Sequence, residues 1–460
     1  MQGTQAPQCA VAIFNLLDRK TLKKCRKVCH EWKAHVDHKT NFWAFANAVK
    51  MGIAAFQGNI EIFTAMINAV TDKNPEGPDG TTLFHLAALN GQLNFCKIIM
   101  NHLIDKNPAC YKDGETPLHA AARGGHFEVC KLIVENAENI NPPDHCGYTP
   151  LHLVAESGNY KIFHCIAKSI ADKNPRDRSG ITPLHIAAEC GHLGICAFLV
   201  NNIIDKNPRN EKDYTTPLHL ATMNGHYDIC RLLINNIEDK NPEANCQGNV
   251  KGTPLHIAAH EGHLDIFRLI LENVEDKNPR NPNTGMTLLH EVAHFGHIEI
   301  CQIYMDHLED KNPEVIVRDE SGQLYRTTPL HKAAGAGHLD LYKLICENNN
   351  WREQRSNGVT SLDLHIAARH GHFEMCKYLI DKYEDKSFAD AEGNTPLHYA
   401  AEGGHFDICS YLVQRIEDKS PVNAAGHTPH KLALRNHHTD VAQLLQSFSK
   451  LKINRRRKKK

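Results

Sequence analysis

Apolar residues recur along the chain as paired short clusters, and the pair returns about every 33 residues. In one such stretch, Leu118, Ala121 and Ala122 follow a spacing of three to four residues. The next cluster, residues 127–134, is apolar on one side of a second helix, and Gly125-His126 separates the two. This pattern predicts pairs of short amphipathic helices joined by a tight turn. Since no single pair can bury its apolar faces alone, we expect the pairs to stack in one dimension.

The phrase Thr-Pro-Leu-His opens the first helix of each pair. It stands at residues 116–119, 149–152, 182–185, 216–219, 253–256, 328–331 and 395–398. Variant copies stand at Thr82–His85, Thr287–His290, Leu362–His365 and Thr428–Lys431. Threonine suits a helix N-cap, and proline suits the first helical position, where its missing N–H costs nothing. The motif therefore predicts where each first helix begins.

This motif and period resemble the ankyrin repeat, and the resemblance covers residues 47–446. It implies an all-α solenoid of helical hairpins with short β-hairpin turns, made of a degenerate first unit and about eleven further units. It also implies a protein-binding surface without catalysis or a cofactor. One departure is the text of residues 236–242, echoed at 202–208 and 273–279, where isoleucine or valine replaces the glycine that usually ends the second helix. We therefore expect a slightly longer second helix that stops at Asn-Pro.

Cysteines and histidines occur at repeated positions, which favours structural roles for both. Seven cysteines, including Cys130, lie five residues after the turn glycine, where other units have Phe163, Phe267 or Tyr342. A position that accepts these residues interchangeably is an apolar packing site. We expect most histidines to hydrogen-bond to backbone groups and to adjacent units, and the fold to lose stability below about pH 6.

Residues 290–294 match the His-Glu-x-x-His pattern of zinc proteases. On a helix, His290 and His294 would share a face and Glu291 could act as a base. However, His290 is also the motif histidine of its own repeat, and no third ligand is evident. We interpret the match as coincidental and expect no metal.

The N-terminal residues 8–46 do not fit the repeat and carry a net charge of +5. Along them stand, in order, Ile13-Phe14, Leu17-Asp18, Leu22, Val28-Cys29, Trp32 and Phe42-Trp43. This order resembles the F-box, with Ala6-Pro7 in place of Leu-Pro and Phe42 in place of leucine. The resemblance implies a small three-helix F-box-like domain in residues 1–46 that binds the Skp-type adaptor of a Skp–cullin–F-box ubiquitin ligase. The expected adaptor-binding residues are Ile13, Phe14, Leu16, Leu17, Leu22, Val28, Trp32 and Trp43. The alternative is a helical cap that only covers the first repeat.

An unidentified protein target is expected on the concave face of the repeats, as the ankyrin resemblance implies. Its expected contacts are the variable residues near the turn glycines and one aromatic residue in an altered turn: Arg123, Glu156, Glu189, Asn224, His260, Phe295, Arg369, His370 and Trp351. Trp351 could equally fill a gap left by that turn. Alternating apolar residues in 314–326 predict a longer β-finger, which is also a candidate for target binding.

Charge and hydropathy limit the remaining possibilities. Residues 47–446 carry a net charge of −14, which disfavours nucleic acid as the main partner. No uninterrupted apolar stretch is long enough to span a membrane, and the N-terminus lacks signal-peptide features, so we expect a cytoplasmic or nuclear location. Residues 447–460 form a tail of net charge +8 after the last helix. The tail is interpreted as a nuclear-localisation signal, a contact for an acidic surface, or a solvated end.

Overall fold

A computed structural model describes residues 60–69, 72–74, 76, 80–244, 252–281, 284–318, 324–348, 360–382 and 388–457. The predicted F-box-like segment and Trp351 lie outside these residues. The chain divides into two compact units at Ile237, and each is described by itself.

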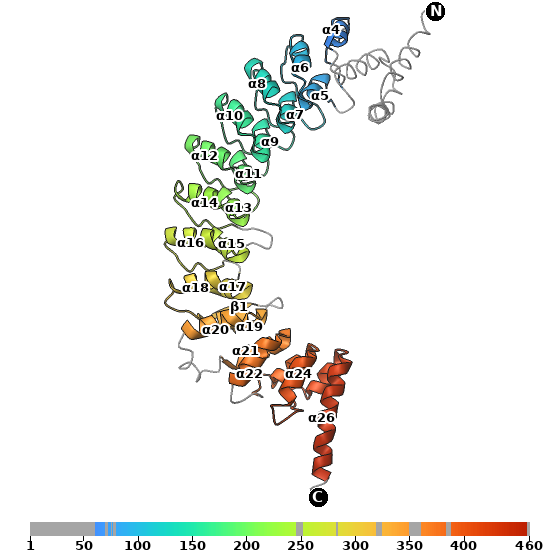
Figure 1. The fold of residues 1–460 in the computed structure, drawn as a ribbon, viewed down its shortest axis with the longest axis vertical. Helices are drawn as coiled ribbons and strands as arrows, with labels where there is room; N and C mark the ends of the chain where they lie inside the picture. The colour runs from blue at the N-terminus through green and yellow to red at the C-terminus, as the bar shows by residue number, and fades with distance from the viewer. Residues whose placement is uncertain are drawn as a thin grey trace, which may run out of the picture. The chain divides into compact units, whose positions relative to one another are not determined.

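The first unit is a stack of helical hairpins. Its helices are α4 (Ile60–Ala69), α5 (Leu83–Leu89), α6 (Leu93–Met100), α7 (Pro117–Arg123), α8 (Phe127–Asn136), α9 (Pro150–Ser157), α10 (Tyr160–Lys168), α11 (Pro183–Glu189), α12 (Leu193–Asn202), α13 (Pro217–Met223) and α14 (Tyr227–Ile234). First helices pack on first helices, as α5, α7, α9, α11 and α13 do in order. Second helices form a parallel row beside them (Figure 1).

The second unit continues the same pattern. Its elements are α15 (Pro254–Glu261), α16 (Leu264–Asn273), α17 (Leu288–Phe295), α18 (Ile298–Met305), β1 (Val315–Arg318), β2 (Leu324–Thr327), α19 (Pro329–Ala336), α20 (Leu339–Asn348), α21 (Thr360–His370), α22 (Phe373–Lys382), α23 (Pro396–Glu402), α24 (Phe406–Val413), α25 (Pro429–Arg435) and α26 (Thr439–Arg457). Apart from the strands β1 and β2 and three isolated β-bridges, the regular structure of the described residues is helical. The expected all-α solenoid of helical hairpins is confirmed.

The first helices with a Thr-Pro pair begin as the sequence predicts, whereas α21 begins at Thr360, two residues before its motif copy. Thr116 is the N-cap of α7, with an extended backbone, and Pro117 follows in the first turn. Gly125 then turns the chain with a φ of 71°, in the left-handed region that glycine adopts without strain. The apolar face is also as predicted, because Leu118, Ala121 and Ala122 are all fully buried.

The repeated cysteine position is a core position, as expected. Cys130 is fully buried, and Phe163 and Phe267 are buried at the same position of their own repeats. Burial raises the pKa of the Cys130 thiol to about 12. These thiols therefore fill space in the core and are not nucleophiles at neutral pH.

The expectation that the second helix runs to Asn-Pro is wrong. Helix α12 ends at Asn202, and Ile203 is extended, with a φ of −120° and a ψ of 157°. Val274 leaves α16 in the same way. A β-branched residue strains in the left-handed conformation that a C-terminal glycine adopts, so the chain leaves the helix through an extended residue instead.

The Asp-Lys-Asn-Pro segment replaces the missing glycine cap with side-chain hydrogen bonds. Lys106 donates from Nζ to the Met100 carbonyl at 2.6 Å, where the helix leaves an acceptor unsatisfied. Asp105 accepts the Asn107 N–H at 2.9 Å. Asn107 Oδ1 in turn accepts the backbone N–H of Leu118, at the start of the next first helix, at 3.0 Å. The segment therefore ends one hairpin and positions the next.

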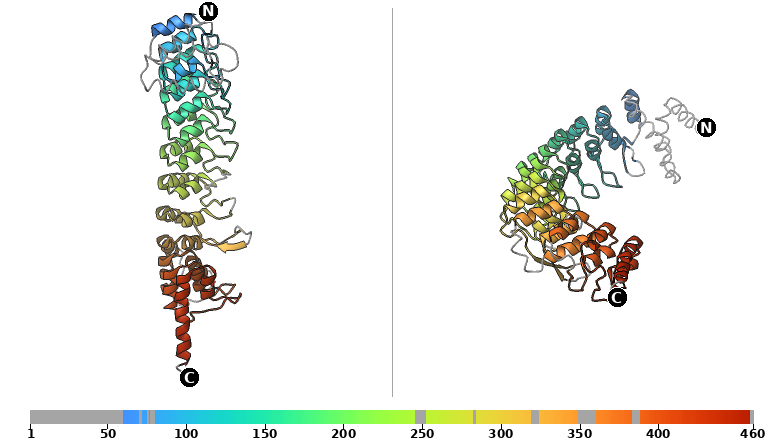
Figure 2. Two further views of the ribbon diagram at one scale, coloured as in Figure 1. Left: turned by 90° about the vertical axis from the view of Figure 1, so that its right-hand side faces the viewer. Right: turned by 60° about the horizontal axis from the view of Figure 1, so that its bottom comes forward.

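Two irregular segments have clear structures. The predicted β-finger is confirmed, since β1 and β2 pair antiparallel with Val315 opposite Thr327. This hairpin projects from the helices of its unit (Figure 2). Helix α26, however, runs to Arg457, so the last helix extends into the basic run that was expected to follow it.

Candidate interaction surface

Most of the motif histidines link their repeat to the one that follows, although Nε2 of His219 and of His256 lacks a hydrogen-bond partner among the described residues. His119 Nδ1 accepts the backbone N–H of Thr116 at 3.1 Å, closing a capping box in which histidine replaces the usual Glu or Gln. Because Nδ1 is the acceptor, the ring proton lies on Nε2. Nε2 then donates to the Tyr148 carbonyl of the next repeat at 3.1 Å. Equivalent forward bonds are made by His85, His152, His185, His290, His365 and His398.

Where a repeat has the Gly-His pair, its histidine links that repeat to the one before it. His126 donates from Nε2 to the Leu89 carbonyl at 3.0 Å. His226 makes the same bond to Glu189, also at 3.0 Å. The expectation that histidines bond to backbone groups and adjacent units is therefore confirmed at both repeated positions. The two sets tie neighbouring repeats together from both sides.

Burial favours the neutral form of several motif histidines. It lowers the pKa of His185 to about 4, and the pKa values of His256 and His290 also fall to about 4. Their neutral form is the one that accepts at Nδ1 and donates at Nε2.

In the first unit, the predicted target residues lie in one row at the C-terminal ends of the first helices. Arg123 ends α7, Glu189 ends α11, Asn224 is the C-cap of α13, and Glu156 lies one residue before the end of α9. All four are exposed. Arg123 forms an ion pair with Glu115 of its own repeat.

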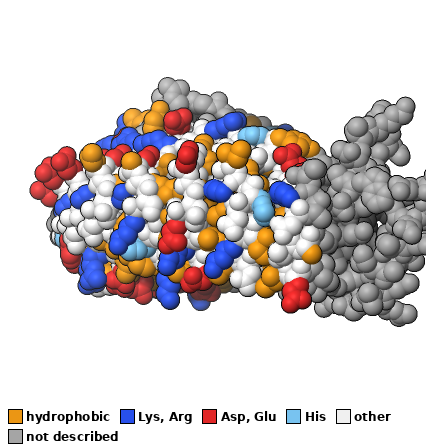
Figure 3. Space-filling view, turned by 90° about the horizontal axis from the view of Figure 1, so that it is seen from above, with side chains coloured by type: hydrophobic (Ala, Val, Ile, Leu, Met, Phe, Trp, Pro, Cys, Tyr) orange, Lys and Arg blue, Asp and Glu red, His pale blue; other side chains and the backbone are white. Residues whose placement is uncertain are grey.

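In the second unit, the same position carries aromatic and basic side chains. The rings of His260 and Phe295 meet edge to face with centroids 4.3 Å apart. Arg369 and His370 are exposed at the end of α21, and the Arg369 guanidinium lies 5.7 Å from the Tyr399 ring centroid. The structure thus brings the predicted residues into register within each unit. Over the face seen in Figure 3, acidic and basic side chains are interspersed.

Two residues on this surface were missed by the sequence analysis. Lys332 follows the motif histidine of α19, and its Nζ lies 5.9 Å from the centroid of the Tyr325 ring on β2. A signal was present in the sequence, because most other units have an aliphatic residue where Lys332 stands. The contact with Tyr325 depends on the path of the β-finger, which no spacing rule specifies.

The His-Glu-x-x-His match is built as a structural element. His290 is fully buried; its Nδ1 lies 2.8 Å from Thr287 Oγ1, and its Nε2 donates to the Thr327 carbonyl. Both ring nitrogens are therefore occupied by hydrogen bonds within the protein and are not available as metal ligands. Glu291 accepts a hydrogen bond from Asn281 at 2.7 Å, and burial raises its pKa to about 7. In the part of the chain that the structure describes, no group of three or more potential ligands is arranged to hold a metal ion.

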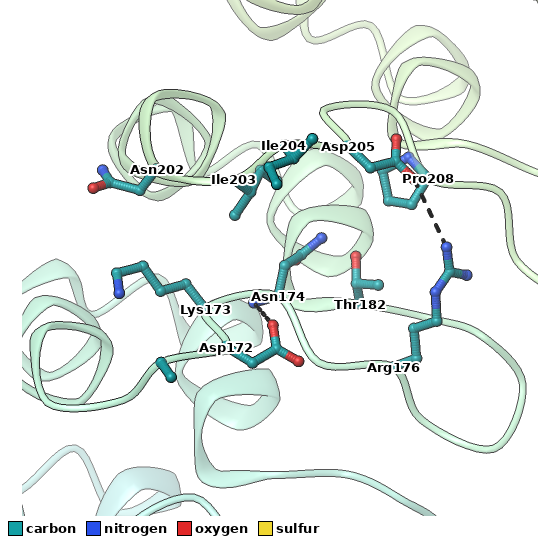
Figure 4. Close-up of a pocket in the computed structure, with 11 residues that line it drawn as sticks. Asp172, Lys173, Asn174, Arg176, Thr182, Asn202, Ile203, Ile204, Asp205 and Pro208 are labelled. Carbon is teal, nitrogen blue, oxygen red and sulfur yellow. Dashed lines mark hydrogen bonds and ion pairs between the residues drawn. The ribbon is translucent and has the colours of Figure 1, made fainter.

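A polar groove of about 300 Å³ lies between two consecutive Asp-Lys-Asn-Pro segments (Figure 4). Arg176 and Asp205 pair across it at 3.8 Å. Lys173 donates to the Ile170 carbonyl, and Asp172 accepts the Asn174 N–H. Each of these charged groups already has an ion-pair or hydrogen-bond partner within the protein.

Comparison with known families agrees with this architecture. A model of ankyrin repeats, built on three copies of the unit, matches residues 51–144, 137–210, 204–281, 237–319, 289–390 and 364–457. The chain belongs to the ankyrin-repeat family, whose members bind protein partners. The match begins at residue 51 and includes no F-box. A search of curated proteins finds no significant match. None of the helices in the described ranges is both long and apolar enough to cross a membrane.

Proposed function

We propose that this protein is the substrate-recognition subunit of a Skp–cullin–F-box ubiquitin ligase. In this proposal, residues 1–46 bind the adaptor, residues 47–446 hold a protein target, and residues 447–460 form a basic tail. The protein supplies recognition, and other subunits supply the ubiquitin-transfer chemistry.

The observation that carries the recognition role is the row of exposed side chains on the first helices. Glu156 and Glu189 occupy nearly the same place in neighbouring repeats, and histidine bonds between repeats hold their backbones. A rigid row of variable side chains lowers the entropy lost when a partner binds. Support for the ligase role is the F-box-like sequence from Ile13 to Trp43 and its net charge of +5, which suits an acidic adaptor.

Co-purification of the full chain with a Skp-type adaptor and cullin tests this role. We expect the parent chain to bind the adaptor and the double variant Ile13→Ala, Trp32→Ala to lose binding. Tyr227→Ala, an exposed aromatic residue on α14, is the matched control and should bind normally. Far-UV circular dichroism shows whether the repeats of each variant remain folded. Failure of the parent chain to bind would exclude the ligase role.

The second candidate is an ankyrin scaffold or inhibitor without a ubiquitin-ligase role. It rests on the same exposed row and needs nothing from residues 8–46 beyond a cap for the first repeat. The adaptor experiment separates the two candidates.

The proposed location is cytoplasmic, nuclear or both. The basic run Arg455–Lys460 is the proposed nuclear-localisation signal. Fluorescent fusions with and without this run test it, because an unchanged distribution would remove the nuclear role.

A further inference from the structure

Lys332 occupies a position that is otherwise mostly aliphatic. The residue after the motif histidine is leucine, isoleucine or alanine in seven of the ten units that have this histidine. Glu291, Lys332 and Tyr399 are the exceptions, and all three belong to the second unit. The chemical character of this surface therefore changes there.

Among the described residues, the ammonium group of Lys332 has no acidic partner. The side chain is half-buried, and no carboxylate of the described residues lies within 4.0 Å of its Nζ. Glu291, at the equivalent position of the preceding repeat, bonds to Asn281 instead. Burial lowers the pKa of Lys332, which shows that its charge is partly desolvated. A cation that is partly removed from water and has no ion-pair partner lowers the stability of the unbound protein. Pairing with a carboxylate of a bound protein would offset this cost.

One aromatic ring lies beside this cation, and a cluster of three further rings lies at the C-terminal ends of the preceding first helices α15 and α17. Tyr325 is 39% exposed and lies 5.9 Å from Nζ, while Phe295 contacts the rings of both His260 and His294. His294 and Phe295 belong to α17, which packs against α19, the helix that carries Lys332. Burial lowers the pKa of His294, and the charge of Lys332 adds to this effect. We call these five residues, Lys332, His260, His294, Phe295 and Tyr325, the Lys332 patch.

We propose that the Lys332 patch is the docking site for an acidic peptide segment of the target protein. An Asp or Glu carboxylate would pair with Lys332 Nζ, and a neighbouring apolar side chain would pack against Phe295 and Tyr325. Charge-assisted pairing of this kind is stronger than a neutral hydrogen bond when it is shielded from water. The proposal rests on the target-binding role proposed above and is independent of adaptor binding.

The observations favour a peptide over a nucleic acid. Glu261 pairs with His260 at 2.8 Å at the edge of the patch, and Glu402 is exposed farther along the same unit. A phosphate backbone needs many aligned cations, whereas this surface supplies one unpaired lysine among rings. That arrangement suits a single carboxylate beside an apolar side chain.

Fluorescence anisotropy with the full-length chain tests the proposal. The probes are three labelled peptides that repeat Asp-Leu-Glu-Phe, Asn-Leu-Gln-Phe or Lys-Leu-Arg-Phe, together with a labelled single-stranded oligonucleotide. We expect the acidic peptide to bind about tenfold more tightly than its neutral counterpart. Lys332→Leu restores the usual aliphatic residue and should remove most of this difference. Lys343→Gln removes one charge from the second helix of the same repeat and should retain the difference.

Several results would overturn the proposal. They are equal binding of the acidic and neutral peptides, an unchanged preference in Lys332→Leu, and tighter binding of the oligonucleotide than of the acidic peptide. An equal loss in Lys343→Gln would also overturn it, because the effect would then reflect net charge alone. Adaptor co-purification with Lys332→Leu separates this outcome from the ligase role, since that variant should still bind the adaptor.

Discussion

The imidazole ring of His226 lies so close to Gly191 that a β-carbon on this glycine would clash with it. A β-carbon built on Gly191 comes within 2.7 Å of the ring, and His226 Nε2 donates to the Glu189 carbonyl at 3.0 Å. Gly191 also has a φ of 81°, in the left-handed region. The glycine therefore has two roles, because it turns its own repeat and makes room for the histidine of the next one.

Gly191→Ala should destabilise the protein more than Gly125→Ala. Both residues have positive φ, which costs alanine about 1 kcal/mol. Only Gly191 faces a histidine, since the next repeat has Asn159 where His226 stands and no atom lies within 4 Å of a β-carbon on Gly125. We expect an additional loss of about 1–2 kcal/mol for Gly191→Ala by urea denaturation. Adding His226→Asn should recover part of that loss, and equal losses at the two glycines would contradict the steric explanation.

His119→Ala should reduce the free energy of unfolding by about 2 kcal/mol, because it leaves the buried N–H of Thr116 without its acceptor. His119→Gln should lose only about 1 kcal/mol. Glutamine at this position can still accept the Thr116 N–H, but it gives up the bond to the Tyr148 carbonyl. Chemical denaturation followed by circular dichroism measures both variants. If glutamine proved as damaging as alanine, the capping role of the ring would be wrong.

Stability should fall as the pH falls from about 6.5 towards 4. The unfolded state binds protons near the ordinary histidine pKa of 6.5, whereas folded His185, His256 and His290 resist protonation until about pH 4. Each of these shifts is equivalent to about 3 kcal/mol, which is present above pH 6.5 and lost across this window. Glu291 acts in the opposite direction, since its raised pKa of about 7 adds stability as the pH falls, but it is one group against several.

Thermal unfolding at a series of pH values measures this dependence. The variant His185→Gln provides the comparison, and its loss of stability between pH 7 and pH 5 should be smaller than that of the parent chain. Stability that did not change over this range would contradict the neutral, buried state of the motif histidines.

Alkylation of the native protein should separate the cysteines by position. Cys146 and Cys190 are exposed and should be modified, whereas Cys130, Cys196 and Cys230 are fully buried. Burial also raises the pKa of each of these three thiols to about 12. Mass spectrometry after iodoacetamide treatment, with denatured protein as the control, identifies the modified sites. Rapid native modification of Cys130 would show that its core position opens readily.

Local sequence was sufficient to predict most of the hairpin. The cap formed by Thr116 and His119 involves residues three positions apart, so its geometry follows from the motif. The ends of the second helices were predicted wrongly. Ile203 was expected to remain helical until Asn-Pro, but the side chains of the Asp-Lys-Asn-Pro segment cap helix ends and allow the chain to leave earlier, as Lys106 and Asn107 show.

The sequence by itself determined the repeat, its helix starts, its buried faces and the row of variable residues, because these depend on neighbours within one hairpin. Only the tertiary structure decided which groups from different repeats meet. His226 reaches back to Gly191, and Lys332 lies beside Tyr325 and away from any carboxylate of the described residues. The physical reason is that a partner one repeat away is selected by how hairpins stack and how the β-finger folds. Neither is encoded in the spacing of a single motif.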